Sequence, residues 1–295
     1  MATVYLVDAS PYVFRAHFSL PSSIKTPAGE PAAASYGFTS FLLKLIADEQ
    51  PTHLAVTFDR SLSSSFRNDF YPAYKQQRML PPPELEAQLT ACEEIAAALG
   101  AATFVDDRYE ADDLIGALCA RLEKHDHGAV IVTSDKDLAQ LVDERTSLLD
   151  FGKGIRLTPE TVFEKFGVRP DQMTDYLGLA GDSVDNIPGV KGIGGKSAAE
   201  LLARFGHLED LYARLDELPS LAASIRGAKS LHTKLVANRD LAFLSKRLAT
   251  VAREVPGVNA TLKDLEYRGA DPARIEELFQ RLGFNKIRER VPYQG

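Results

Sequence analysis

The sequence predicts an α/β domain built on a parallel sheet, followed by a smaller helical module. Four short runs are almost entirely apolar and rich in β-branched residues: TVYLVD, THLAVTFD, ATFVDD and GAVIVTSD. Runs without a regular polar alternation are typical of parallel strands that helices cover on both faces. After GDSVDNIP the pattern changes to glycine-rich and then short helical segments. We therefore place the α/β domain at residues 1–180 and the helical module at 181–295.

The segments between the apolar runs carry apolar residues at helical spacing. They are SYGFTSFLLKLIADE, PELEAQLTACEEIAAALG and EADDLIGALCARLEKH, at residues 35–49, 83–100 and 110–125. SAAELLARF has the same pattern after the loop GVKGIGGKS. Short helices joined by turns are expected beyond it, with one weak extended piece near the end.

The composition limits the class of protein. With 295 residues, 45% of them hydrophobic and 25% charged, the chain is typical of globular proteins. No apolar run is long enough to span a bilayer, and MATVYLVDASPYVFR lacks the features of a signal peptide. Cys92 and Cys119 fall in helical apolar patterns, which favours buried free thiols. We expect a cytoplasmic protein that does not bind membranes.

Carboxylates gather where the predicted strands end. Asp8, Asp59 and Asp135 lie at the ends of TVYLVD, THLAVTFD and GAVIVTSD. The carboxyl ends of parallel strands meet at one edge of the sheet, so these three side chains are expected to converge. Further acids follow nearby in EADD, TSDKD and GDSVDN: Glu110, Asp112, Asp113, Asp137, Asp182 and Asp185.

Nine carboxylates at one edge need positive compensation. Any single one could cap a helix, but together they would repel one another and destabilise the fold. Mg²⁺ prefers oxygen ligands, and two such ions about 4 Å apart activate a water and stabilise the leaving oxygen in phosphodiester cleavage. We predict two or more Mg²⁺ ions, with Mn²⁺ as an expected substitute. No cluster of His and Cys offers a zinc site.

The charge balance then permits a nucleic-acid partner. The net charge of −7 alone argues against one. Setting nine site acids apart from the 41 leaves 32 acids against 34 bases, a net charge of +2 for the rest.

Two basic segments are candidates for DNA contacts. SSSFRNDFYPAYKQQR mixes Arg67, Lys75 and Arg78 with four aromatic residues, and two interpretations stay open. The segment is either a solvated helix face with packed aromatics or a grip on a single strand. GVKGIGGKS is not a Walker A loop, because Val190 stands where that motif needs glycine and no strand precedes it, so no nucleotide cofactor is expected. Its backbone N–H groups could still bind phosphate.

Together these motifs resemble the 5′-nuclease family, which includes the 5′→3′ exonuclease domain of bacterial DNA polymerase I and the flap endonucleases. The resemblance covers nearly the whole chain through LVDASPYVFRAHF, SYGF, FDRSLSSSFRNDFYPAYKQQR, YEADDLIG, TSDKDLAQLV, GLAGDSVDNIPGVKGIGGKSAAELL and the closing LGF. It implies a PIN-like α/β domain, a helical arch at about residues 66–90, and a helix–three-turn–helix DNA-binding module. Since the chain ends at Gly295, we expect no attached polymerase.

The resemblance also implies roles for single residues. A first metal would be held by Asp8, Asp59, Glu110 and Asp112. Asp112 would bridge to a second metal with Asp135, Asp137 and Asp185, while Asp113 and Asp182 would act through waters. Lys75 and Arg78 would lie near the scissile phosphate, with Arg15, Arg67 and Tyr74 as further substrate contacts. Duplex DNA would be gripped, around a K⁺ held by carbonyls, by Gly189, Lys191, Gly192, Gly194, Gly195, Lys196 and Ser197.

The expected function is a structure-specific, metal-dependent 5′→3′ exonuclease and 5′-flap endonuclease of DNA replication or repair. It would act as a monomer on DNA with a 5′ flap or 5′ end and a duplex arm. Two alternatives belong to other classes. A PIN-type ribonuclease would share the acids but would not need GVKGIGGKS, and a non-catalytic binder of DNA structures would keep that loop and lose the acids.

Overall fold

A six-stranded sheet with the order β3-β2-β1-β4-β5-β6 forms the centre of the α/β body. The computed structural model describes residues 2–60, 64–78 and 81–293. Five strands are parallel and the sixth pairs antiparallel with β5. They are β1 (Thr3–Asp8), β2 (Leu54–Asp59), β3 (Ala102–Asp106), β4 (Gly128–Val132), β5 (Thr146–Asp150) and β6 (Ile155–Leu157). The four predicted strands are confirmed, and β5 and β6 were not predicted.

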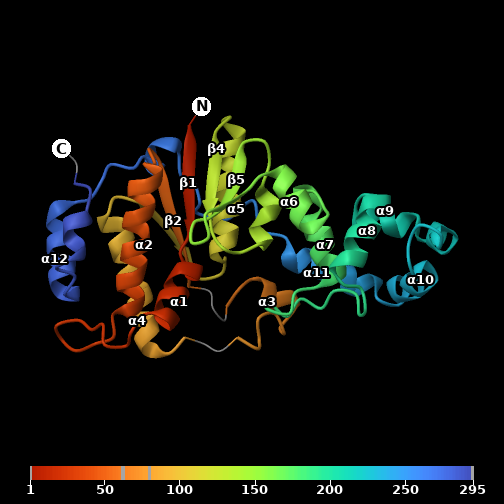
Figure 1. Ribbon diagram of the computed structural model, residues 1–295, viewed down its shortest axis with the longest axis horizontal. Coiled ribbons are helices and arrows are strands. Elements are labelled where there is room, and N and C mark those ends of the chain that lie inside the picture. The colour runs from red at the N-terminus through yellow and green to blue at the C-terminus, as the bar shows by residue number, and fades with distance from the viewer. Residues whose placement is uncertain (1, 61–63, 79–80, 294–295) are drawn as a thin grey trace.

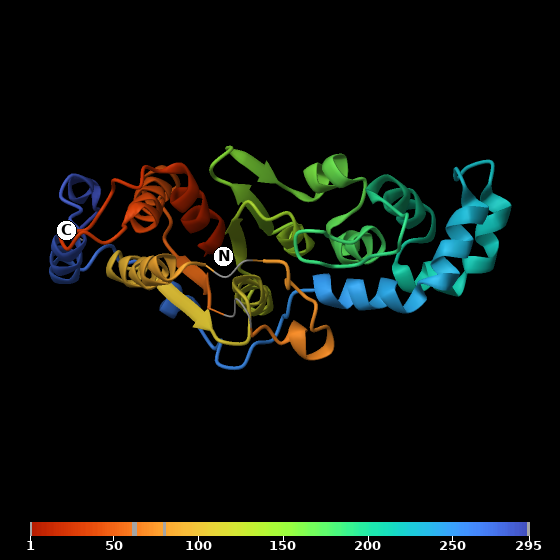
Figure 2. The same ribbon diagram turned by 90° about the horizontal axis from the view of Figure 1, so that it is seen from below.

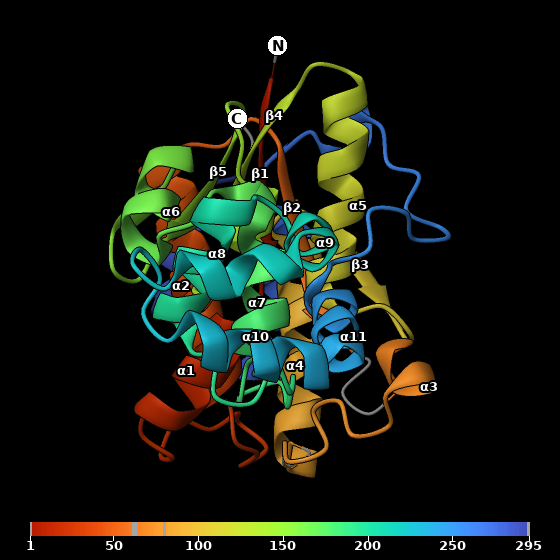
Figure 3. The ribbon, with the colours of Figure 1, turned by 90° about the vertical axis from the view of Figure 1, so that its right-hand side faces the viewer.

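Helices cover both faces of the sheet, as expected for strands with apolar residues on both sides. Val7, Val56 and Val132 face a core that α1 (Ser10–Ser19), α2 (Ala33–Glu49) and α4 (Pro83–Ala98) complete. Leu6 and Ile131 face the other side, where α5 (Ala111–Lys124) packs. Figure 3 shows α2 and α5 on opposite sides of the strands.

The helical module extends from one end of this body (Figure 1). α6 (Pro159–Phe166) leads to it, and it contains α7 (Met173–Ala180), α8 (Gly195–Phe205), α9 (Leu208–Ala213), α10 (Ala228–Ala237) and α11 (Arg239–Ala249). The short α3 (Arg67–Phe70) lies beside it. Five 3₁₀ helices complete the described chain: η1 (Asp137–Leu141), η2 (Pro170–Gln172), η3 (Leu215–Leu221), η4 (Leu262–Leu265) and η5 (Ile287–Arg290). The apolar core of the helical module is continuous with the core under α5, so the module is anchored to the sheet.

The last part of the chain differs from the predicted boundary at 181–295. After α11 the chain runs back to the α/β body, and α12 (Pro272–Leu282) packs beside α4 at the end opposite α10 (Figures 1 and 2). The Asp271 N–H donates to the Ala98 carbonyl at 2.9 Å. The apolar side of α12, with Ile275, Leu278 and Phe279, joins the core under α2 and α4. The amphipathic pattern predicts such a helix but does not say which layer receives it.

Two further findings concern the predictions on membrane segments and cysteines. Within the described residues, no helix combines the length and the apolar character needed to cross a membrane. Cys92 and Cys119 are buried free thiols, as predicted.

Candidate active site

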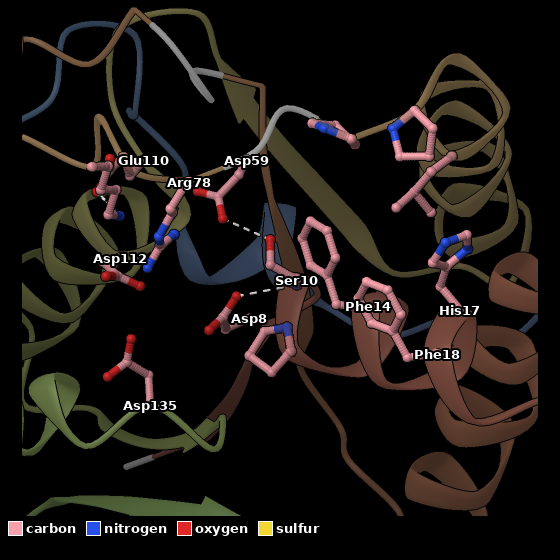
Figure 4. A pocket seen from close by; sticks show the side chains of 15 residues that line it. Asp8, Ser10, Phe14, His17, Phe18, Asp59, Arg78, Glu110, Asp112 and Asp135 are labelled. Atoms are coloured by element: carbon pink, nitrogen blue, oxygen red, sulfur yellow. Dashed lines mark hydrogen bonds and ion pairs between the residues drawn. The ribbon is translucent and has the colours of Figure 1, made fainter. Parts of the chain in front are cut away.

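A cleft of about 770 Å³ opens at the carboxyl edge of the sheet. One wall is acidic and carries two basic side chains, and the other wall is apolar (Figure 4). The acidic wall consists of Asp8, Asp59, Glu110, Asp112 and Asp135, with Lys75 and Arg78. Phe14 and Phe18 of α1, with Pro82 and Leu85 at the start of α4, form most of the apolar wall. The predicted convergence of strand-end acids is thus observed for five of the nine carboxylates.

Asp8 and Asp59 are fixed by hydrogen bonds from neighbouring elements. Asp8 accepts from the Ser10 N–H at 3.2 Å and from the Thr133 hydroxyl at 2.8 Å. Asp59 accepts from the Ser10 hydroxyl at 2.6 Å and from the N–H of Ala111, the first residue of α5, at 2.7 Å. These bonds orient both carboxylates into the cleft, with Ser10 as a shared donor.

Lys75 and Arg78 neutralise part of the acidic wall. The Lys75 ammonium lies 2.8 Å from Glu110 Oε2 and 3.6 Å from Asp185 Oδ2. Arg78 also pairs with Asp185. Burial opposes the charge on Lys75, but the attraction of Glu110 raises its pKa well above the ordinary lysine value. Lys75 is therefore a permanent cation beside the cleft.

Four other acids at this edge have a raised pKa. Burial, together with repulsion from Asp59, raises the pKa of Asp8 to about 8. Burial and the charge of Asp135 raise the pKa of Asp112 well above its ordinary value, and burial raises the pKa of Asp135 as well. Burial followed by repulsion from Asp135 raises the pKa of Asp137 to about 7. Such mutual repulsion indicates a site that needs additional positive charge.

The donor set fits divalent cations in its chemistry. All candidate ligands are carboxylate oxygens, which hard cations prefer. In Figure 4 the side chains of Asp8, Asp112 and Asp135 point towards the same space. Among the described residues, however, no three His, Cys, Asp or Glu side chains lie close enough together to hold one ion as they stand. Binding an ion therefore requires these side chains to draw together around it.

Comparison with known proteins places this site in a family. Residues 3–167 match the N-terminal resolvase-like domain of the 5′-3′ exonucleases, and residues 168–273 match their C-terminal SAM fold. The chain belongs to the 5′-3′ exonuclease family. It is 39% identical over 290 residues to DNA polymerase I of Bacillus caldotenax and 41% identical over 293 residues to that of Geobacillus stearothermophilus. These matches cover 97% and 98% of this chain but 32% of each relative, so the chain spans about a third of their length.

Solved structures share the fold of this exonuclease-family chain. The T5 D15 protein co-crystallised with metal ions superposes with a TM-score of 0.69 at 19% identity, covering 98% of this chain and 100% of that one. The catalytic core of Rad2 in complex with DNA substrate gives a TM-score of 0.62 at 18% identity, over 98% and 91% of the two chains. The resemblance and the fold expected from the sequence are thereby confirmed.

In this exonuclease-family chain Arg67, Tyr74 and Asp113 have partners within the protein, and their predicted roles stay predictions. The Arg67 guanidinium donates twice to the Asp113 carboxylate, at 2.7 and 2.8 Å, and both side chains are buried. Asp113 also accepts from the N–H groups of Glu110 and Ala252. A carboxylate with these partners holds the start of α5. Tyr74 is 4% exposed and donates to Glu110, so its ring is not available for stacking on bases.

Other predicted residues lie outside the cleft lining. Asp182 pairs with Lys136. Burial opposes the charge of Asp182, but the hydrogen bond and charge of Lys136 together with the N–H groups of Val184 and Asp185 lower its pKa. Lys136 also lies 3.1 Å from Asp137. Arg15 is exposed on α1, and its guanidinium lies against Gly152. A Cβ added to Gly152 would lie 2.1 Å from Arg15 Nη1.

The predicted helical arch at residues 66–90 falls partly outside the described residues, because 79–80 are not described. Its described parts form α3, a series of turns and the first half of α4. Lys75 lies in those turns with a left-handed backbone, φ +52°. The backbone therefore turns sharply at the residue that reaches into the acidic wall.

The loop GVKGIGGKS follows α7 and includes the first residues of α8, and it is tightly built. Gly189 has a left-handed backbone, φ +60°, and packs on Gly181. A Cβ added to Gly189 would lie 2.4 Å from the backbone nitrogen of Gly181. An added Cβ at Gly195 would meet the Tyr176 hydroxyl at 2.1 Å, whereas Gly194 has open space. Lys191 and Lys196 are exposed and Ser197 is half-buried.

Sequence reasoning missed the apolar wall and the supporting donors. Phe14 and Phe18 stand four residues apart in SPYVFRAHF, which places them on one helix face. That spacing, close to Asp8 in the sequence, could have predicted an apolar wall beside the acids. Ser10 follows Asp8 by two residues, a common spacing for a backbone N–H bonded to an aspartate.

Proposed function

We propose that the chain is a metal-dependent 5′ nuclease that hydrolyses phosphodiester bonds of DNA at 5′ flaps and 5′ ends. The observation that carries this proposal is the acidic wall of the cleft. Its carboxylates repel one another in the absence of added positive charge, and two permanent cations stand beside them. Membership of the 5′-3′ exonuclease family supports the same reaction class.

Divalent ions, with Mg²⁺ preferred and Mn²⁺ as a substitute, would supply a polarised water and neutralise the charge on the leaving oxygen. One ion would be held by Asp8, Asp59, Glu110 and Asp112. The other would be held by Asp112, Asp135, Asp137 and Asp185, with Asp182 acting through a water. Glu110 and Asp185 are paired with Lys75 in the structure, so these carboxylates must exchange that cation for the ions.

That exchange gives Lys75 and Arg78 their role. If Glu110 and Asp185 held the ions, Lys75 and Arg78 would be free to contact the scissile phosphate. A cation placed there stabilises the charge that develops in the transition state. Asp112, which would contact both ions, and Asp135 are the acids for which we expect the largest catalytic effect. Among the described residues, neither has a protein cation as a direct partner.

The rest of the substrate would lie on two other surfaces. The apolar wall of Phe14 and Phe18 offers faces for the bases of a displaced strand. The loop at 189–197, with exposed Lys191 and Lys196, would hold phosphates of the duplex arm and would not read bases. T5 D15 flap endonuclease, which shares this fold, was crystallised with DNA and metal ions, and this supports the assignment. We expect the active form to be a monomer.

The test uses three labelled substrates: a 5′-flap DNA, a blunt duplex and a single-stranded RNA. The proposal predicts Mg²⁺-dependent cleavage near the flap junction, none in EDTA, and slow cleavage of the RNA. Preferential RNA cleavage would instead support a PIN-type ribonuclease. Flap binding without cleavage in either Mg²⁺ or Mn²⁺ would support a non-catalytic binder of DNA structures.

A further inference from the structure

Lys234 contacts the glycine-rich loop, although it lies 42 residues away in the sequence. It lies on α10, and its ammonium donates to the carbonyl of Gly192 at 2.9 Å. Gly192 has a left-handed backbone, φ +80°, and an added Cβ would lie 2.9 Å from the Lys234 Nζ. Glycine at this position therefore provides both the turn and the space in which the ammonium lies.

A potassium ion, which the family resemblance implies for this loop, would have to share three carbonyls that already accept hydrogen bonds. K⁺ gives up its water shell only when several carbonyl oxygens replace it together. The Gly192 carbonyl is bonded to Lys234, and that of Val190 accepts from the Ile193 N–H at 2.9 Å. The Gly194 carbonyl accepts from the Ala198 N–H at 3.0 Å. In addition, the ammonium would repel a second cation at the same carbonyl.

We propose that Lys234 is the built-in cation of this loop, replacing a bound monovalent ion. Its ammonium holds residues 189–195 in place and neutralises one phosphate of a duplex arm. An ammonium has three N–H donors, and the bond to Gly192 uses one of them. The phosphate contact rests on the proposed function, whereas the ordering of the loop does not.

The consequence is a particular salt dependence of DNA binding. Release of counterions from the phosphates makes affinity fall with salt concentration, whichever monovalent cation is used. A loop that needs K⁺ would add a preference for K⁺ over other cations. A loop that carries its own ammonium has no such preference.

The first experiment measures binding of the chain to a flap DNA and to a plain duplex, with Ca²⁺ in place of Mg²⁺ to suppress cleavage. Binding is compared in KCl, NaCl and tetramethylammonium chloride at equal concentration. Tetramethylammonium is too large to lie among the loop carbonyls. We expect dissociation constants that agree within about twofold across the three salts, since the counterion term is common to them. Affinity at least fivefold higher in KCl would overturn the proposal.

The second experiment compares Lys234→Met with Lys229→Met. Lys229 lies in the exposed first turn of the same helix and gives the same loss of charge. Lys234→Met should weaken duplex binding about tenfold, as expected for one charge-assisted hydrogen bond, and lower the salt slope by about 1. It should also speed amide hydrogen exchange at residues 189–195, and Lys229→Met should leave that exchange unchanged.

The outcomes separate this inference from the proposed function. Intact flap cleavage with unchanged loop exchange and unchanged binding in Lys234→Met would overturn the role of Lys234 alone. Absence of duplex binding by the parent in all three salts would overturn both the phosphate contact and the proposed function. If amide hydrogen exchange at residues 189–195 were nevertheless faster in Lys234→Met, only the claim that Lys234 orders the loop would be retained.

Discussion

Removing the charge of Arg67 tests the most consequential difference between sequence and structure. The guanidinium donates to both Asp113 oxygens, to the Leu248 carbonyl at 2.8 Å and to the Thr250 carbonyl at 3.0 Å. The side chains of Arg67 and Asp113 are only 3% and 0% exposed. Arg67→Met therefore leaves a buried carboxylate without its counter-charge. Breaking a buried pair in this way costs about 3–5 kcal/mol.

The assays are guanidinium chloride unfolding and thermal unfolding of three variants. Arg67→Met should lower the free energy of unfolding by about 3–5 kcal/mol and the melting temperature by about 6–20 °C. Arg108→Met is the matched control, because Arg108 pairs with Asp69 at the surface and such pairs contribute about 0–1 kcal/mol. Arg67→Met combined with Asp113→Leu should recover part of the loss, since replacing both partners removes the unpaired charge.

The same variants decide whether Arg67 contacts DNA. A buried guanidinium has no surface for a phosphate, so flap affinity in Ca²⁺ should stay within about threefold of the parent, well below the tenfold expected for a lost charge-assisted contact. The reasoning is refuted if Arg67→Met unfolds within about 1 kcal/mol of the parent and loses tenfold or more in flap affinity. That result would restore the role implied by the sequence resemblance.

Three further predictions concern the cleft and the loop. Because burial and Asp59 raise the pKa of Asp8 to about 8, the metal-free folded protein retains a proton that the unfolded chain loses above about pH 4. Its melting temperature in EDTA should therefore fall from pH 5.5 to pH 8.5, and saturating Mg²⁺ should remove the fall; a flat profile in EDTA would contradict this. Lys75→Met should slow single-turnover cleavage about 10²–10³-fold with little change in flap affinity, whereas equal losses would make Lys75 a binding residue. Gly195→Ala should destabilise by about 1–3 kcal/mol through contact with Tyr176, while Gly194→Ala, which has open space, should not; equal melting temperatures would contradict the packing.

The sequence predicts the catalytic edge well because one rule governs it. Apolar runs without polar alternation indicate parallel strands, and such strands bring their carboxyl ends together. Asp8, Asp59 and Asp135 could therefore be assigned to one site from position alone. Both the strands and the cleft confirm that reasoning.

What the sequence could not supply were contacts between distant segments. Arg67 is bonded to backbone carbonyls 181 and 183 residues away, and nothing near SFRND distinguishes a buried arginine from an exposed one. Likewise, Lys234 meets Gly192 across 42 residues of chain. The short strands β5 and β6 and the return of α12 to the α/β body depend equally on packing that local patterns do not encode.

The central claim is that the acidic wall hydrolyses DNA through bound divalent ions. The most direct measurement is single-turnover cleavage of a 5′-labelled flap DNA by Asp112→Asn, across a Mg²⁺ series and beside the parent. The account predicts a folded variant that binds the flap in Ca²⁺ like the parent and cleaves it at least about 10³-fold more slowly at every Mg²⁺ concentration, since a lost ligand removes transition-state stabilisation. Cleavage by Asp112→Asn within about tenfold of the parent at saturating Mg²⁺ would contradict it.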